Sequence, residues 1–412
     1  MDKLKIIINK RTFILYLVLV FAVFNDILRI SNSDFTLFRV LQPFVLVYML
    51  VTSPKSRIIT AFYIGVMFIN TIQYYVFVTF NLSGIKSDIR EFLSFIYFYL
   101  CITTVICLVV TIQEKSGSEF KNQFASFLRA VGKINIFIVL FHGLIRAYTS
   151  ISVGNVNNYG ASIAAFFPFF AVGALKKRNV WDIVFCILSA VALYVGDCKL
   201  SLVGIVLEVF ILMLLLSNKR SKKKQGNIRI VYIGLVVLFV LAVFYAISGT
   251  RMGALIYGQL NTAIDHVRNL EYYSSSSSLG YRTNVIIMGI RCLVKKHYFG
   301  IGMGNFGKII RDNVPFLANK WIEKGYVSPH NTPLQWLIEF GPIAVILYIW
   351  IARLIVVTFK RERTDFNIIF LVEFLSVWIW ILNPSRIESI FALWTVFAFL
   401  ITINKGEAKS II

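Results

Sequence analysis

The sequence lacks the motifs of most metal-dependent and nucleotide-dependent enzymes. Its four histidines show no zinc-motif spacing, and its five cysteines form neither a zinc-type pair nor a disulfide framework. It has no phosphate-binding loop of the Walker type, no nucleophile motif for serine or cysteine catalysis, and no paired aspartates that could hold a divalent cation. We therefore expect neither a metal nor a cofactor.

Acidic residues are also scarce, and apolar residues take most of the sequence. The 412 residues include 20 Asp and Glu against 42 Lys and Arg, and 58% are hydrophobic, with a mean hydropathy of +0.75. Apolar runs of roughly 17–25 residues, the length that crosses a bilayer, recur along the chain. The sequence predicts an all-α polytopic membrane protein with about twelve transmembrane helices. They are expected at 12–28, 35–52, 58–80, 92–112, 131–148, 158–175, 180–196, 200–217, 230–248, 333–357, 367–383 and 387–404.

The basic residues are unevenly distributed between the two sides of these spans. Segments on one side hold 24 of the 42 Lys and Arg, and the five short loops opposite hold seven. By the positive-inside rule, both termini and the run 219–229 face the cytoplasm, and the segment 249–332 is a large outer loop. The +22 net charge is thereby explained as a topology signal, so no nucleic-acid partner is expected. The predicted organisation is a nine-span part (1–248), the outer loop (249–332) and a three-span part (333–412), forming one integral domain.

The large outer loop carries ten Lys and Arg against four Asp and Glu. Topology does not require this charge, so it indicates either an ordinary solvated loop or a site for an anionic ligand. After five serines at 274–278, the apolar pattern of 283–294 predicts a helix lying on the bilayer surface. The segment 300–307, GIGMGNFG, is rich enough in glycine to let backbone N–H groups approach a phosphate, although this signal alone is weak.

The stretch 328–341, SPHNTPLQWLIEFG, opens the tenth expected span. Thr332 as N-cap, Pro333 at the first helical position and Gln335 at N3 form a predicted capping box. His330 and Asn331 then lie at a helix start, where unpaired N–H groups and the helix dipole favour an anion. A histidine there can carry a proton near neutral pH. The alternative is that His330 lies at the end of a helix without a role in catalysis or binding.

Several cations are expected at the same outer face. Lys199 lies in the short turn between the seventh and eighth spans, and Arg282 begins the helix of the large loop. Arg146, which ends the fifth span, and Arg251, which begins the loop, are weaker candidates of the same kind. A lysine such as Lys199 can also be a helix-end residue whose amine reaches the interface. Separately, Glu208 and Glu373 fall near mid-span and are expected to face the bundle interior.

These residues carry a resemblance to a known family. The pattern H-N-x(2)-L-x(4)-E-x-G is similar to the signature of the O-antigen ligase and polymerase superfamily. It is formed by His330, Asn331, Leu334, Glu339 and Gly341. Upstream, Arg282 followed by a helix and by Gly300, Gly302 and Phe306 also fits the family. The segments 157–161 and 196–201 resemble its sixth-span entry and its small-S/T-R/K turn, with Lys199 where ligases usually carry arginine.

The resemblance implies a membrane glycosyltransferase of the GT-C kind, in the bacterial inner membrane, with a periplasmic active site. The donor would be an oligosaccharide on undecaprenyl pyrophosphate, transferred with inversion and without a metal. His330 would act as general base and Arg282 would bind the pyrophosphate. Lys199 would supply a second phosphate contact, and Asn331 would orient the local backbone. Because Glu339 falls on the opposite helix face at 100° per residue, we interpret it as structural.

Within the family, the sequence favours a polymerase that joins lipid-linked repeat units of O-antigen or capsule. The alternative is a ligase that transfers the finished chain to a lipid A core or to protein. A lipid-linked oligosaccharide flippase is the alternative of another class. It predicts two similar halves, which the sequence lacks, and a midplane cation or proton site. Further partners implied by the polymerase interpretation are a chain-length regulator and a flippase.

Overall fold

The computed structural model describes eleven stretches of the chain; 91% of the residues in these stretches are helical, and none of them forms a β-strand. The described residues are 10–25, 36–79, 89–149, 156–196, 198–217, 251–272, 278–294, 299–313, 331–362, 364–380 and 390–408. The expected all-α class is confirmed. Of the expected spans, 230–248 lies outside the described residues, and the described part of each of the others is mostly helical, with 333–357 divided between two helices.

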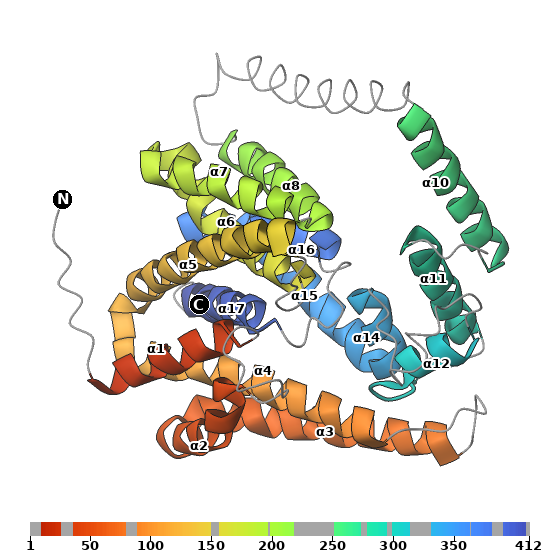
Figure 1. The fold of residues 1–412 in the computed structure, drawn as a ribbon. Coiled ribbons are helices and arrows are strands. Elements are labelled where there is room, and N and C mark those ends of the chain that lie inside the picture. Colours follow the sequence, from red (N-terminus) through yellow and green to blue (C-terminus); the bar gives the residue numbers. More distant parts are fainter. Residues whose placement is uncertain are drawn as a thin grey trace.

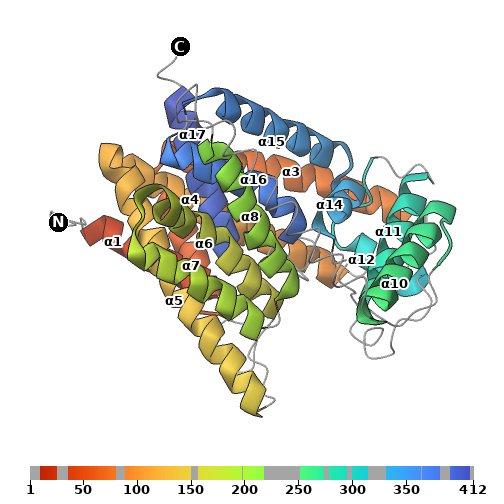
Figure 2. The same cartoon turned by 90° about the horizontal axis from the view of Figure 1, so that it is seen from above.

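The helices fall into two assemblies (Figure 1). The first, which we call the helix bundle, is built on one continuous apolar core. It comprises α1 (Lys10–Val23), α2 (Leu37–Thr52), α4 (Ile89–Ser116), α5 (Phe120–Thr149), α6 (Val156–Lys177), α7 (Val180–Val195), α8 (Lys199–Ser217), α16 (Asp365–Trp380) and α17 (Phe391–Ala408). The second, the outer module, comprises α10 (Arg251–Asn269), α11 (Ser278–Val294), α12 (Asn305–Asn313) and α14 (Thr332–Phe340). Two further helices extend from the bundle to the module (Figure 2). They are α3 (Pro54–Thr79) and α15 (Pro342–Lys360).

Four helical stretches are long and apolar enough to cross a membrane: Pro54–Thr79, Phe92–Phe141, Asn158–Lys177 and Pro342–Lys360. Several shorter apolar helices accompany them. The most apolar windows of α3 and α15 are only 22% and 11% buried within the protein, whereas that of α6 is 89% buried. Apolar helices that are exposed on the outside of the protein are stable in a lipid bilayer but not in water. The fold therefore fits a polytopic membrane protein whose central helix is α6.

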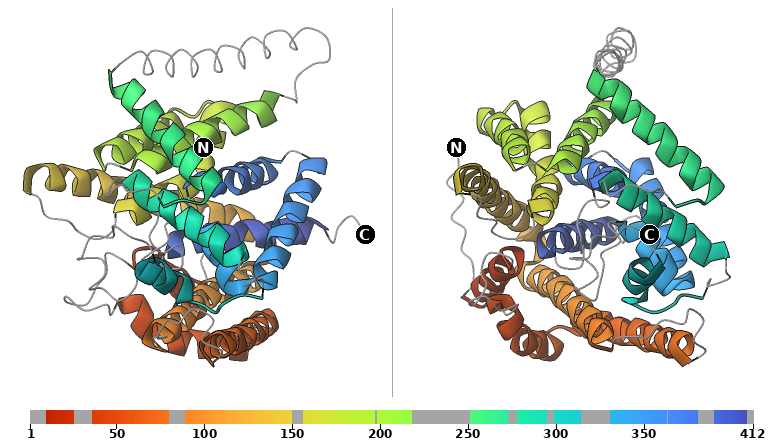
Figure 3. Two further views of the ribbon diagram at one scale, coloured as in Figure 1. Left: turned by 90° about the vertical axis from the view of Figure 1, so that its right-hand side faces the viewer. Right: turned by 45° about the vertical axis from the view of Figure 1, so that its right-hand side comes forward.

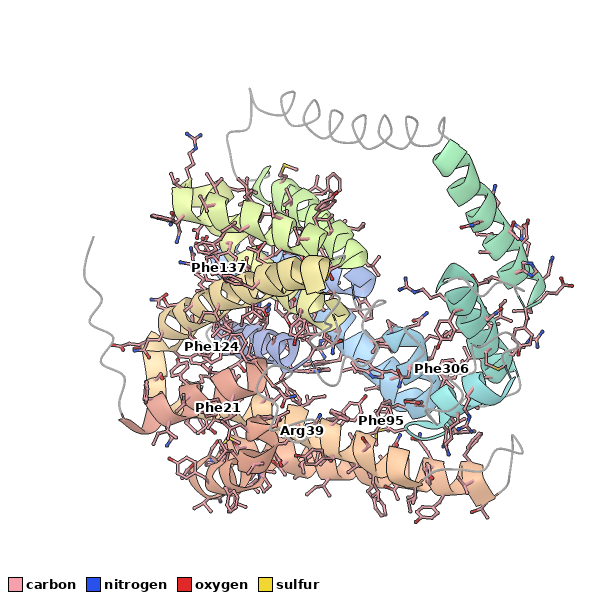
Figure 4. The ribbon with its side chains drawn as sticks, in the orientation of Figure 1. Phe21, Arg39, Phe95, Phe124, Phe137 and Phe306 are labelled. Atoms are coloured by element: carbon pink, nitrogen blue, oxygen red, sulfur yellow. The ribbon has the colours of Figure 1, made fainter. Side chains whose placement is uncertain are left out.

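The bundle core is filled by stacked aromatic rings. Phe124 of α5, which is labelled in Figure 4, stacks on Phe399 of α17 at a centroid distance of 4.9 Å, and Phe169 of α6 lies 6.2 Å from the same ring. Lys176, near the end of α6, pairs with Asp365 at the start of α16, and Arg361, just before α16, donates to the Asn404 side chain near the end of α17. Helices α6 and α17 therefore finish at the same end of the bundle and begin at the same opposite end.

The tenth expected span, 333–357, is wrong as a single helix. The structure breaks it at Gly341, which has a φ of +57° and ends α14 after nine residues. Pro342 then begins α15. Gly341 readily adopts the left-handed conformation that terminates a helix, and proline suits the first position of the next one. Consequently α14 belongs to the outer module, beside α11 and α12, and only α15 continues into the apolar region (Figure 3).

Candidate functional site

Helix α11, which carries Arg282, packs directly on α14. Gly289 makes this contact possible, because a Cβ atom there would lie 2.5 Å from the Leu334 side chain. Around it, buried apolar residues of α11, α12 and α14 form one cluster, which also receives Phe77 of α3. Its buried members from the outer module are Val285, Met288, Cys292, Ile301, Phe306, Ile309, Ile310 and Ile338.

This packing corrects the expectation that the loop helix lies with its apolar face in the bilayer surface. Within the protein, Val285 and Ile287 have no exposed area, and Met288 is 6% exposed. The apolar face of α11 is therefore covered by protein. The amphipathic pattern was interpreted correctly as a helix, but periodicity does not distinguish a lipid neighbour from another helix.

Arg282 is the fifth residue of α11 and lies two turns before Gly289. Its side chain is half-buried, and this loss of water lowers the pKa of the guanidinium below its usual range. It also interacts with other groups of the protein. A partly desolvated guanidinium at the edge of a packed interface would gain from a phosphate, since each group replaces water that the other has lost.

Asn331, not Thr332, is the N-cap of α14. The Asn331 side chain accepts a hydrogen bond from the Leu334 backbone N–H at 3.2 Å, and the helix starts at Thr332. The predicted capping box is thus wrong by one residue. Gln335 instead donates to the Glu339 carboxylate, one turn further on, at 3.1 Å. His330, the preceding residue and the candidate base, lies outside the described residues.

The glycine-rich segment 300–307 binds the C-terminal end of α14. Gly300, Gly302 and Gly304 have φ values of +87°, +82° and +81°. The Ile301 and Gly302 N–H groups donate to the Ile338 and Glu339 carbonyls at 3.1 and 3.0 Å. These are carbonyls that the end of an α-helix leaves without an intrahelical partner. Cβ atoms on Gly300 and Gly302 would lie 2.7 Å from the Glu339 carbonyl oxygen and 2.6 Å from the Tyr74 Cα. The alternating glycines are therefore required by close backbone contact.

The sequence suggested that backbone N–H groups of the glycine-rich segment 300–307 bind a phosphate, but they bind the Glu339 carboxylate instead. One carboxylate oxygen, Oε1, accepts hydrogen bonds from the Gly304 and Phe306 N–H groups at 2.9 and 3.2 Å. These donors lie at the start of α12, where the helix dipole favours a negative charge. Glu339 is 1% exposed, so this acceptor is part of the protein interior. The glycine-rich segment is consequently not a phosphate cradle, and Glu339 is structural, as its helix face indicated.

Helix α3 contributes two amides that sequence reasoning did not single out. Asn70 Oδ1 accepts from the Met303 N–H at 3.0 Å, and Gln73 donates to the carbonyls of Phe299 and Phe340. Both residues interrupt the apolar run of the third span. A signal was present in the sequence, because amides inside an apolar run need polar partners. Together with Glu339 they fix the glycine-rich segment between α3 and α14.

Lys199 and Arg146 come from one end of the bundle. Lys199 is the first residue of α8, immediately after buried Cys198. At Gly160, near the start of α6, a Cβ atom would lie 2.8 Å from the Cys198 Cβ, so the turn packs tightly on α6. A Cβ at Gly196 would lie 3.3 Å from Val139 of α5, and Arg146 is two turns beyond Val139. The side chains of Lys199 and Arg146 lie outside the described residues.

The outer module lies at the same end of the bundle. Trp336 of α14 contacts Trp394, near the start of α17, with ring centroids 6.1 Å apart. Since α17 and α6 begin at one end, α14 is on the side where α8 starts and α5 finishes. Arg251 begins α10, which pairs with α11 through a hydrogen bond from Arg291 to the Leu270 carbonyl and through Arg291 over the Tyr272 ring.

The structure thus brings the backbones of Arg146, Lys199 and Asn331, on α5, α8 and at the start of α14, to one end of the molecule, with α11 and its Arg282 packed on α14. Helices α10 and α12 were not predicted. Their signal was the spacing of apolar residues in otherwise polar sequence, such as Ile309 and Ile310 in α12. Among the described residues, no three His, Cys, Asp or Glu side chains form a group able to hold a metal ion.

A comparison with protein families gives one match. The family model described as O-antigen ligase matches residues 184–349, from α7 to α15. The matched range contains Lys199, Arg251, Arg282, His330 and Asn331, and it excludes Arg146 and the 157–161 segment. It supports the O-antigen ligase and polymerase superfamily that the motif around His330 resembles. No curated protein matches the chain.

Proposed function

We propose that this chain, a member of the O-antigen ligase and polymerase superfamily, is a polymerase that joins lipid-linked oligosaccharide repeat units. The observation that supports it best is the convergence of α8, α11 and α14 at one end of an apolar bundle. These three helices carry Lys199, Arg282 and the His330–Asn331 pair. An anionic lipid donor needs such a position, because its pyrophosphate stays at the membrane surface while its chain stays in lipid.

The proposed reaction is an inverting displacement at the anomeric carbon of the donor sugar. The acceptor hydroxyl of a second lipid-linked unit attacks this carbon, and the bond to the undecaprenyl pyrophosphate oxygen breaks. His330 takes the hydroxyl proton as general base. Arg282 forms paired hydrogen bonds to the leaving pyrophosphate, and Lys199 adds a point charge, so the negative charge that develops is stabilised. Arg146 and Arg251 assist substrate binding, and Asn331 fixes the start of α14 beside the base.

A polymerase is favoured over a ligase because Lys199 stands where ligases usually carry arginine. The surface polysaccharide of a deletion strain tests this choice. Loss of the polymerase leaves a single repeat unit on the acceptor. If chains of normal length instead accumulate on the carrier lipid, the protein is a ligase. Absence of polysaccharide, with lipid-linked units trapped on the inner leaflet, would indicate a flippase.

The base is tested by His330→Gln in a purified assay with lipid-linked repeat units. Glutamine keeps the approximate size and hydrogen bonding but cannot take up the proton. Turnover should fall by roughly 10²-fold or more while donor binding survives. His266→Gln is a matched control, because His266, whose Nδ1–H donates to the Glu271 carbonyl at 3.2 Å near the end of α10, has no proposed role in the reaction. A His330→Gln enzyme within a few-fold of wild type would exclude the base.

The anion contact is tested by Arg282→Ala and Arg282→Lys. Both should lose most polymer formation, because lysine lacks the planar fork that binds phosphate through two hydrogen bonds. Arg268→Ala, an exposed arginine on α10, provides the control. Lys199→Arg should be tolerated if Lys199 is a simple phosphate contact. Long chains made by Arg282→Ala would mean that the pyrophosphate docks away from α11.

We further propose that the protein lies in the bacterial inner membrane with both termini in the cytoplasm and the outer module in the periplasm. The unequal distribution of Lys and Arg supports this arrangement. A cysteine introduced as Ser276→Cys should react with a membrane-impermeant reagent in cells whose outer barrier is open. Reaction only after lysis would reverse the topology.

A further inference from the structure

One aromatic side chain beside the glycine-rich segment is left almost entirely uncovered by protein. Phe299 is 79% exposed, the highest value for a large apolar side chain in the described part of the chain. Its backbone, in contrast, is fixed. Gln73 of α3 donates a hydrogen bond to the Phe299 carbonyl, and a Cβ atom on the next residue, Gly300, would lie 2.7 Å from the Glu339 carbonyl oxygen. A firmly held backbone therefore presents the ring to whatever surrounds the protein at this level.

The contact with Gln73 places Phe299 beside the lipid-facing surface of α3. At 100° per residue, Gln73 lies on the border between two faces of this helix. Phe77, on one side of the border, is buried, whereas Ile69 and Val76, on the other side, are exposed. Because the Phe299 ring is exposed too, it lies on the side of Ile69 and Val76. Phe299 thus continues the exposed apolar face of α3.

The second lipid-facing helix, α15, begins at the same place. Gln73 also donates to the carbonyl of Phe340 at 3.2 Å, and Phe340 is the last residue of α14, two residues before Pro342 begins α15. In the first half of α15, Ile346 is 66% exposed. Phe299 therefore lies next to both of the long apolar helices whose surfaces are mostly left uncovered by protein.

The lengths of these two helices place Phe299 at the boundary of the hydrocarbon layer. From Pro54, the first residue of α3, the rise to Gln73 is roughly 28 Å at 1.5 Å per residue. From Lys360, the last residue of α15, the rise back to Pro342 is roughly 27 Å. Both values are close to the thickness of a hydrocarbon core, which is about 30 Å. Apolar side chains at this depth bury in the zone between headgroups and acyl chains.

We propose that Phe299 inserts its ring into the bilayer leaflet next to the outer module, beside α3 and α15. The partner is the acyl region of the membrane lipids. Since Phe299 is joined directly to the glycine-rich segment that binds α14, its insertion fixes the height of α14 above the membrane. This membrane anchor does not depend on which reaction the protein catalyses.

Spin labelling of the full-length protein in vesicles tests the surroundings of this position. A nitroxide is attached to Phe299→Cys, and its collisions with oxygen, which concentrates in lipid, are compared with those with a water-soluble nickel complex. The vesicles contain phosphatidylethanolamine and phosphatidylglycerol and no polyprenyl lipid, so ordinary acyl chains are the apolar partner offered. Phe62→Cys, at a position of α3 that is 74% exposed, is the lipid reference. Asp265→Cys, on an exposed polar part of α10, is the water reference.

The ratio of oxygen to nickel collisions at Phe299→Cys should be several-fold above that at Asp265→Cys and should approach that at Phe62→Cys. A ratio equal to that at Asp265→Cys would mean that the ring meets water, and it would overturn the proposal. Few collisions with either reagent would mean that protein, such as a second copy of the chain, covers the position, which also contradicts it. Wild-type protein treated in the same way corrects for the five native cysteines, four of which are buried.

The unmodified protein provides a second measurement if Phe299→Cys does not accumulate. A lipid-soluble carbene precursor is photolysed in the same vesicles, and the modified residues are located by fragment mass. Adducts on Phe299 together with adducts on the exposed face of α3 would support the anchor. Adducts on α3 without any on Phe299 would contradict it.

Discussion

The helix bundle and the outer module are held together by different forces. The bundle is a single core of apolar and aromatic side chains, in which rings such as Phe124 and Phe399 stack. The outer module has a small apolar cluster of its own, and Met303 and Phe340 join a second one with α3 and α4; its attachment adds backbone hydrogen bonds, buried amides and one carboxylate. Its close contacts require glycine, as at Gly302 against α3.

This difference has consequences for how each region responds to change. Apolar packing is non-directional and tolerates swaps that conserve volume. Backbone hydrogen bonds and left-handed glycines admit little variation in shape or angle. The candidate site lies where α11 and α14 meet in the second region. We therefore expect the position of the site to be lost through single changes that the bundle would absorb.

The largest effect is expected from Gly302→Ala. Alanine must adopt a φ of +82° there, and its Cβ would lie 2.6 Å from the Tyr74 Cα, a backbone atom that cannot move aside. The strained backbone alone costs roughly 1–3 kcal/mol, before the collision is counted. Polymer formation should fall to background, measured with purified protein and lipid-linked units.

Gly65→Ala on α3 is the matched control. A Cβ at Gly65 meets nothing within 4 Å, and alanine favours a helix over glycine by roughly 0.5–1 kcal/mol. This variant should retain activity and unfold at the same or a higher temperature. Near-normal activity of Gly302→Ala would show that the module does not depend on the glycine-rich segment.

Glu339→Ala should have the second largest effect. It leaves the Gly304 and Phe306 N–H groups and the Gln335 amide without their acceptor, and each unsatisfied buried donor costs about 1–3 kcal/mol. Undocking of α12 from α14 should appear as faster proteolysis within residues 295–331. Glu339→Gln should recover most of the protection, since its amide oxygen can accept both N–H bonds after Gln335 turns its amide. Equal loss in both variants would mean that the charge, not the acceptor, is required.

Most helices of the bundle could be predicted from the sequence, because a long apolar run that crosses a bilayer must form a helix to satisfy its backbone hydrogen bonds. The break at Gly341 was missed although a Gly-Pro pair marks it, because the apolar run continues on both sides. The helix that carries Arg282 was predicted from its periodicity. Its packing against α14 was not predicted, because an apolar helix face has the same pattern whether it contacts lipid or protein.

The glycine-rich segment illustrates what sequence could not give. Its pattern correctly indicates backbone N–H groups available to an anion, and the anion is Glu339, more than 30 residues later in the chain. The spacing of the glycines cannot predict which acceptor binds these N–H groups, because the acceptor is distant in the sequence. The same applies to Glu208 and Glu373, whose burial was predicted, whereas the hydrogen bond from Ser376 to Glu208 was not.

A smaller effect is expected from Phe124→Leu in the bundle. The ring has no exposed area and stacks on Phe399, so the loss should be about 1–2 kcal/mol, seen as a lower midpoint of heat unfolding. Activity at permissive temperature should remain. Phe141→Leu, on the exposed face of the same helix at 65% exposure, should change neither quantity. Loss of activity without loss of stability in Phe124→Leu would contradict the tolerance assigned to the bundle.

The smallest effect separates two roles of Asn331. Its side-chain oxygen caps α14 through the Leu334 N–H, and a contact to the donor pyrophosphate is the second role to be tested. Asn331→Asp keeps the cap and improves its interaction with the helix dipole, whereas Asn331→Ala loses about 1 kcal/mol of capping. If capping is the whole role, the aspartate variant should equal wild type in turnover and KM, and the alanine variant should lose a few-fold in turnover. If Asn331 also approaches the donor pyrophosphate, the negative charge of aspartate should raise the KM for donor more than alanine does. The cap and the ligand contact thus predict opposite orders for the two variants, and initial rates over a range of donor concentrations distinguish them.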